Sequence, residues 1–346
     1  MKKRKVMISN IIMCFILIAS IIMAASIGSA SLTVRGSLQI ILSRVPIVRH
    51  FISLEGIKPT FEIIVWNIRI PRILLAGLCG ASLSLVGVCF QGLFRNPLAD
   101  PQIIGVSSGA ALGATLAVLS GVSVSFAGLS GIGLFAFLGA IVTVVLVYRI
   151  SCTGNRAPVV HIILTGTAVS SMLSAVISLL LCMRREDLEK IYMWTLGSFS
   201  GATMNKVIFL LIFLVICGVI IFIFAKDLDM ILTGEEAAMS LGVDTVMVKK
   251  ILIVVASVLV AVSVSVSGTI GFVGLIIPHI VRLICGPKHR KLMPLAALTG
   301  AVFLIWCDTI ARTIRSPGEI PVGVVTALCG APYFLYLLNR SKKKVV

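Results

Sequence analysis

Ionisable side chains within long apolar runs are the first residues of this chain whose type and spacing suggest chemistry. Asp308 lies in LIWCDTIARTIR and His279 lies in GLIIPHIVRL, and both runs are mostly apolar. An ionisable group at membrane depth is costly, so either residue is a candidate proton relay. Arg312 follows Asp308 by four residues on the same helical face, which makes it an obvious counter-ion. Two roles of Asp308 stay open: it can form an ion pair with Arg312, or it can take part directly in transport. His279 lies near the predicted cytoplasmic end of its helix, which favours a capping role.

The sequence lacks the motifs of several other chemistries. It contains no G-x-x-x-x-G-K-[ST] phosphate loop, no H-E-x-x-H and no G-x-S-x-G. Its four histidines are scattered, and its nine cysteines include no C-x-x-C pair. We therefore expect no enzyme activity, and no metal or cofactor held by this chain.

The segment TGEEAAMSLGVD, residues 233–244, is predicted to form a short helix on the cytoplasmic side. Thr233 and Glu236 have the spacing of a capping box, and Gly242 suits a left-handed helix end. A short helix that is small and apolar on one side fits the groove of a partner protein. A helix lying on the membrane surface would favour Lys and Arg instead. The candidate partner-contact residues are Gly234, Glu235, Glu236, Ala237, Ala238, Met239, Leu241 and Gly242.

The composition indicates an all-α polytopic membrane protein with a single domain over residues 1–346. The chain is 58% hydrophobic and only 12% charged, and one crossing needs about 20 apolar residues. The first run is longer than the core of a secretory signal, which favours a span over a cleaved signal peptide. Ten spans, some of them short or interrupted, are predicted near 7–29, 73–93, 103–121, 126–148, 160–182, 206–225, 248–267, 270–285, 293–311 and 320–338.

The formal net charge of +17 is distributed over the ends of these spans. The basic residues at both ends of the chain and in alternate loops place both termini in the cytoplasm. The sequence contains no basic stripe with interleaved aromatic residues, so it does not predict a nucleic-acid partner. Several arginines nevertheless fall on the outer side, among them Arg69, Arg72 and Arg312. Docking of an acidic partner and indifferent solvated charge are both open explanations.

A polar stretch, FRNPLADPQIIGVSSGAALG, interrupts the apolar pattern between two spans. Asn96, Pro97 and Pro101 must end the preceding helix. The small residues Gly105, Gly109 and Gly113 then recur every four positions, which allows another helix to approach closely. GTIGFVGLIIP, which contains Pro278 and precedes His279, is a weak echo of this pattern. We predict that both segments serve as a joint or hinge, as interrupted helices do in transporters.

Five ordered motifs resemble the permease subunits of ABC importers for ferric siderophores, haem and corrinoids, the FecCD/BtuC-like family. They are RIPRILLAG, GVCFQGLFRNPLADPQIIGVSSGAALGA, GEEAAMSLGV, GTIGFVGLIIPHIVRL and EIPVGVVTALCGAPYFLYLL, and the likeness runs from about Trp66 to Leu338.

The resemblance implies a BtuC-like bundle of ten helices in a prokaryotic cytoplasmic membrane. The partners it implies are a second permease subunit, identical or closely related, two ATPase subunits that carry ATP and Mg, and an extracytoplasmic binding protein. The segment around Glu236–Gly242 resembles the coupling helix that meets the ATPase. Arg69, Arg72 and Arg312 match the arginines that meet acidic residues of the binding protein.

The expected function is therefore inward transport of an iron chelate, haem or corrinoid by alternating access. A proton-coupled secondary transporter that uses Asp308 or His279 is the alternative. The resemblance assigns no role to the outer loop, residues 31–60, and it does not choose the cargo.

Overall fold

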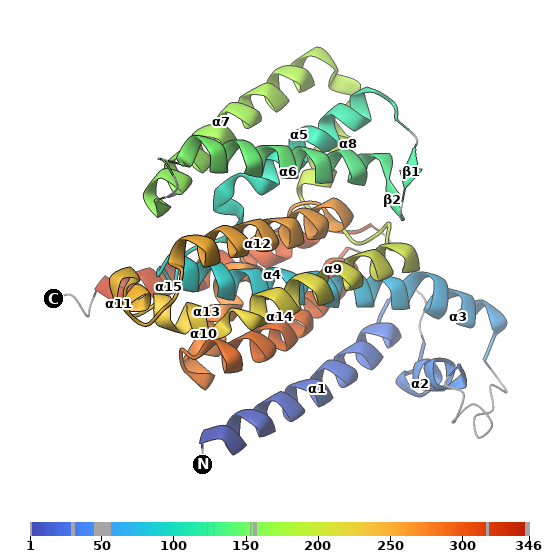
Figure 1. The fold of residues 1–346 in the computed structure, drawn as a ribbon. Helices are drawn as coiled ribbons and strands as arrows, with labels where there is room; N and C mark the ends of the chain where they lie inside the picture. Colours follow the sequence, from blue (N-terminus) through green and yellow to red (C-terminus); the bar gives the residue numbers. More distant parts are fainter. Residues whose placement is uncertain are drawn as a thin grey trace.

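The computed structural model describes residues 2–28, 32–44, 57–122, 124–126, 128–152, 154, 158–315 and 318–342. Within these residues the regular secondary structure is helical except for a short antiparallel hairpin of β1 (Ser125–Phe126) and β2 (Leu129–Ser130), and loops connect the elements. The confirmed fold class is thus an all-α membrane protein. Figure 1 shows most of the long helices running roughly along one direction.

Among the described residues, seven helical segments are long and apolar enough to cross a membrane, and three apolar helices are shorter. The long ones are α1 (Lys2–Ser26), the continuous α3 (Pro59–Ile63), η2 (Ile64–Arg69) and α4 (Ile70–Leu93), then α6 (Gly131–Ser151), α7 (Val159–Met183), α9 (Met204–Ile223), α12 (Thr245–Ser267) and α14 (His289–Ala311). The shorter ones are α5 (Val106–Leu119), α13 (Val273–Cys285) and the apolar part, Val322–Leu337, of α15 (Val322–Lys342).

These ten helices correspond to the ten predicted spans, with one large difference in the bounds. The second span begins at Pro59 rather than near residue 73, because a π-helical stretch, η2, continues into α4 without a break. The predicted outer loop also contains a helix, α2 (Val34–Ser43), whereas residues 45–56 lie outside the described residues. Thr33 caps α2 by accepting a hydrogen bond from the amide of Gly36.

Helix α4 forms the centre of the bundle and is buried along almost its whole length. It packs against α14, α13, α12 and α9. Figure 1 shows α5, α6, α7 and α8 (Leu188–Thr195) as a layer on one side of this centre and α1 on the other. The short elements η3 (Pro101–Ile104), η4 (Arg185–Asp187), α10 (Ala225–Ile231) and α11 (Glu235–Ser240) complete the described helices.

The two ends of the bundle carry different elements. The start of α1, the end of α15 and the short helix α11 lie at one end (Figure 1). Helices α2 and α3 and the β1–β2 hairpin lie at the other end. We call the first the α11 end and the second the α3 end.

Candidate functional site

A buried ion pair joins the α3 end of α4 to the end of α14. The Arg72 guanidinium donates Nε to both carboxylate oxygens of Asp308, at 3.1 and 2.9 Å, and Nη2 to Oδ1 at 2.8 Å. The two side chains are only 8% and 2% exposed. A guanidinium fork on a carboxylate is among the strongest charged pairs in proteins. Two neighbouring helices, α4 and α14, are therefore held together at this end.

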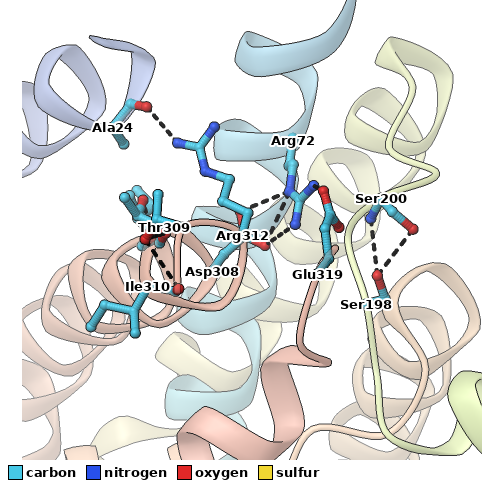
Figure 2. A network of polar contacts seen from close by, with 11 residues as sticks. Ala24, Arg72, Ser198, Ser200, Asp308, Thr309, Ile310, Arg312 and Glu319 are labelled. Atoms are coloured by element: carbon cyan, nitrogen blue, oxygen red, sulfur yellow. Dashed lines mark hydrogen bonds and ion pairs between the residues drawn. The ribbon is translucent and has the colours of Figure 1, made fainter. Parts of the chain in front are cut away.

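The direct partner of Asp308 is Arg72 rather than Arg312, the counter-ion that the sequence suggests. The hydrogen bonds to Asp308 come from Arg72, and Arg312 instead donates Nη2 to the carbonyl of Ala24 at the end of α1. Figure 2 shows the Arg312 side chain directed toward Ala24 and away from the pair. The reason is geometric, because Arg72 on the neighbouring helix can present its fork to the carboxylate.

The last carbonyls of α1 accept hydrogen bonds from a second arginine. Arg69 donates Nη1 to the carbonyls of Ala25, at 2.5 Å, and Ser26, at 3.3 Å. The last carbonyls of a helix lack intrahelical partners and carry partial negative charge, so cations stabilise them. The three arginines predicted to dock a partner are thus brought together at one end of the bundle, where each bonds within the chain. Docking through them remains a prediction.

Glu319, which sequence reasoning missed, completes this cluster. Its Oε1 accepts a hydrogen bond from Nη1 of Arg72 at 2.7 Å, and its side chain is 39% exposed. Figure 2 shows Arg72 between Asp308 and Glu319. The only signal in the sequence is an acid between two prolines, each two residues away, in RSPGEIPVG, and 247 residues separate it from Arg72.

The polar break lies between α4 and α5. Helix α4 ends at Leu93, the amide of Leu98 donates to the side chain of Asn96 at 2.9 Å, and Pro101 opens η3. Gly105 has a φ of +81°, which favours glycine, and it leads directly into α5. Gly109 and Gly113 lie against α6 so closely that an added Cβ on Gly113 would lie 2.0 Å from the carbonyl oxygen of Phe135.

The two segments predicted as hinges pack against each other. A Cβ on Gly87 of α4 would lie 1.9 Å from the carbonyl oxygen of Gly274 in α13. Pro278 has no amide hydrogen, so this carbonyl lacks its helical donor. Gln91 of α4 donates Nε2 to it at 3.5 Å and to the carbonyl of Leu275 at 3.0 Å. An added Cβ on Gly274 would also lie 2.7 Å from a ring carbon of Pro101, so the two segments are in direct contact, and their role as a hinge remains a prediction.

The entrance to α13 is fixed from the other side as well. Gln102 in η3 donates Nε2 to the carbonyl of Ile270 at 2.7 Å. Phe272, just before α13, has a φ of +69°, an uncommon backbone conformation for a bulky residue. His279 follows on α13, and its Nδ1 makes no hydrogen bond within the described part of the chain. The capping role expected for His279 is therefore not observed at that nitrogen.

The predicted capping box at Thr233 is wrong. The Thr233 hydroxyl donates to the carbonyl of Met230 behind it, and Gly234, with a φ of +132°, precedes the first residue of α11. The sequence spacing fits a cap, but Thr233 is used to end the preceding turn. Gly242 ends the segment with a φ of +87°, in the left-handed region.

Helix α11 presents a mixed apolar and acidic surface. Met239 is 46% and Leu241 66% exposed, whereas Ala238 is fully buried. Glu235 is ion-paired with Lys249 of α12, which fixes α11 on the bundle. Met239 and Leu241 thus face outward, and the small residue Ala238 faces inward.

A second polar contact missed by sequence reasoning joins α10 to α14. The amide and Nδ1 of His289, at the start of α14, lie 2.9 and 2.6 Å from Oδ1 of Asp229 in α10. Burial alone raises the pKa of Asp229, but the hydrogen bonds from His289 outweigh this and hold it below its ordinary value. The carboxylate is therefore ionised at neutral pH and ties α10 to α14.

The sequence matches the model of the FecCD transport family over residues 16–340. The chain belongs to the FecCD transport family. It is 43% identical over 292 residues to the cobalamin import system permease BtuC of Halobacterium salinarum, covering 84% of this chain and 77% of the relative. It is 36% identical to the molybdate import system permease MolB of Haemophilus influenzae, covering 95% and 94%.

A solved structure has the same fold. It is described as an inward-facing conformation of a metal-chelate type ABC transporter, and the TM-score is 0.81 at 34% identity, over 96% of this chain and 98% of that one. The chain is therefore a multi-pass membrane permease subunit of an ABC importer, a class that in general pairs with a second permease subunit and ATPases. It is not an enzyme itself, because ATP hydrolysis belongs to the separate ATPase subunit.

Proposed function

We propose that this permease moves a metal chelate, namely a ferric siderophore, haem or a corrinoid, inward across the cytoplasmic membrane of a prokaryote. The observation that carries this cargo class is the likeness to the metal-chelate type transporter over nearly the whole chain. The cobalamin permease relative supports it too. The molybdate permease relative makes molybdate the main competing cargo.

In this proposal residues 1–346 form one permease domain that pairs with an identical or closely related subunit. The family supports such pairing, because ABC importers in general contain two permease subunits. The α11 end, with both termini, faces the cytoplasm, in keeping with the basic residues at each end of the chain. ATP and Mg are held by the ATPase subunits, and this chain needs no cofactor.

Helix α11 is the proposed coupling helix. Its exposed Met239 and Leu241 suit an apolar groove, and the exposed Glu235 and Glu236 suit a basic rim. Gly234 and Gly242 bound the helix, Ala237 is exposed, and Ala238 packs inward. ATP binding on the partner would move the two coupling helices of a dimer together.

The joint between α4 and α13 is the proposed hinge of alternating access. Asn96, Pro97 and Pro101 interrupt one side of it, and Pro278 and His279 lie on the other. Gly105, Gly109 and Gly113 let α5 pack closely on its neighbours, so that α5 and α6 can move as a unit. The contact of Asp229 with His289 gives α10 a direct connection to α14 during this motion.

The cluster of Arg69, Arg72 and Arg312 is the proposed docking site for the acidic surface of an extracytoplasmic binding protein. It lies at the α3 end, opposite the coupling helix. The ion pair with Arg72 gives the buried Asp308 carboxylate a structural role between α4 and α14, which leaves the proton-coupled alternative without a free acid at this position.

Purification of the tagged chain from its native membrane tests the cargo proposal. We expect an ATPase at equal stoichiometry and a binding protein that docks on the complex. That binding protein should bind a ferric siderophore, haem or a corrinoid, and it should not bind molybdate. A binding protein selective for molybdate would overturn the cargo class and leave the permease assignment intact.

A further inference from the structure

We propose that Glu319 is an internal substitute for an acidic residue of the binding protein. In the free permease Glu319 accepts a hydrogen bond from Nη1 of Arg72. When the binding protein docks, one of its carboxylates takes the place of Glu319 at this nitrogen. The exchange releases the segment 319–323 at the head of α15. This inference rests on the proposed docking function of the arginine cluster.

The two carboxylates around Arg72 differ in access. Asp308 takes Nε and Nη2 and is 2% exposed, whereas Glu319 takes only Nη1 and is 39% exposed. A partner approaching from outside can therefore compete with Glu319 and cannot reach Asp308. The exchange keeps Arg72 paired at every stage, so no buried cation is left without a counter-ion.

Glu319 is connected to several helices through the residues that follow it. The amide of Ile320 donates to the carbonyl of Ala311 at the end of α14, at 3.0 Å. The amides of Val322 and Gly323 donate to the carbonyls of Gly197 and Leu196, just after α8, at 3.0 and 3.1 Å. Movement of Glu319 is thus transmitted to α14, α15 and the end of α8.

The contact at Gly323 has no spare room. An added Cβ there would lie 2.2 Å from the carbonyl oxygen of Leu196. The backbones of the first turn of α15 and of the residues after α8 are already in contact. The two segments must therefore either move together or move apart. Glu319 holds this contact in place from one side, through Arg72.

The released segment is also a wall of a cavity. Glu319, Ile320 and Pro321 line a cavity of about 410 Å³, together with Trp194, Ser200 and Lys206. Figure 2 shows Ser198 and Ser200 on the far side of Glu319 from Arg72. Lys206 gives Glu319 a second cation in the same cavity after it leaves Arg72. Docking would therefore reshape this cavity.

The first test measures binding-protein affinity for the assembled transporter in lipid nanodiscs. Glu319→Gln removes the competing charge at constant shape, and we expect about three- to tenfold tighter docking. Glu189→Gln, at an exposed acid on α8, is the matched control and should not change the affinity. Unchanged or weaker docking by Glu319→Gln would overturn the exchange.

A second variant separates the exchange from the docking site itself. Arg72→Lys keeps a cation beside Asp308 but loses the nitrogen that bonds Glu319, so docking should weaken. In this background Glu319→Gln should have no further effect on the affinity, because Glu319 no longer competes for Arg72. If Arg72→Lys leaves docking unchanged, the docking role of Arg72 fails. If Arg72→Lys weakens docking but Glu319→Gln, made alone in the otherwise unchanged permease, does not strengthen it, docking stands and the exchange fails.

Hydrogen exchange distinguishes this proposal from a passive role of Glu319, because a passive surface charge would not change the exchange rates of the backbone amides that follow it. Docking should accelerate exchange of the Ile320, Val322 and Gly323 amides, and Glu319→Gln should do so without the binding protein. Slower exchange of these amides on docking would contradict release of the segment.

Discussion

Leu241→Asp is expected to abolish transport and leave the permease itself folded. Leu241 is 66% exposed on the proposed coupling surface beside Met239, so the substitution removes no core contact. In a partner groove it loses about 1.5–3 kcal/mol of apolar burial. An unpaired charge would add about 3–5 kcal/mol. Together these effects predict a loss of ATPase affinity of at least about a thousandfold.

Co-purification of the ATPase and ATP-driven uptake in vesicles measure this effect. Leu241→Met, which keeps an apolar side chain, is the matched control and should retain both. Ala238→Asp is unsuitable as a test, because Ala238 is fully buried and its substitution would disturb the packing of α11. An assembled and transporting Leu241→Asp complex would show that α11 is not the coupling helix.

Asp308→Ala is expected to destabilise the permease by about 3–5 kcal/mol. The substitution leaves the Arg72 guanidinium, which is 8% exposed, without the partner that takes three of its hydrogen bonds. Arg72→Met combined with Asp308→Leu should recover much of the loss, because an apolar pair of similar size needs no counter-ion. Thermal unfolding of purified permease in detergent is the measurement.

The longer ion pair of Asp187 and Lys190, in which the aspartate is 16% exposed, provides the control. Its atoms lie 3.7 Å apart and the lysine is 75% exposed. Asp187→Ala should therefore cost at most about 1 kcal/mol. If the Asp308→Ala permease were as stable to heat as the Asp187→Ala permease but no longer transported, the stabilising role of Asp308 would be contradicted. A direct role of Asp308 in transport, as a proton relay, would then be favoured.

The helices could be predicted from sequence because hydropathy and proline act locally. Long apolar runs are enough to place ten helices, and Pro97 and Pro101 are enough to end α4. The start of the second span was misplaced because Trp66, Asn67 and Arg69 interrupt its hydropathy, although they continue the helix as η2. Sequence pattern therefore predicts where apolar helices exist better than where they begin.

The partners of polar side chains could not be predicted in the same way. Arg72 and Asp308 are 236 residues apart, and Asp229 and His289 are 60 apart. The sequence suggests Arg312 as a counter-ion for Asp308 because Arg312 follows it by four residues on the same helical face. Such pairs depend on which helices become neighbours, and a single sequence carries no direct signal for that.

Thr233 shows the same limitation at short range. Its spacing to Glu236 fits a capping box, but its hydroxyl donates to Met230. Two local hydrogen bonds compete for one side chain there, and spacing does not decide between them.

The most direct measurement of the central claim is uptake by vesicles that contain the permease, its ATPase and its binding protein. We predict that uptake of the chelate requires hydrolysable ATP inside and persists when an ionophore removes the proton gradient. Uptake by the permease alone, without ATP and abolished by the ionophore, would contradict the account and favour a proton-driven transporter.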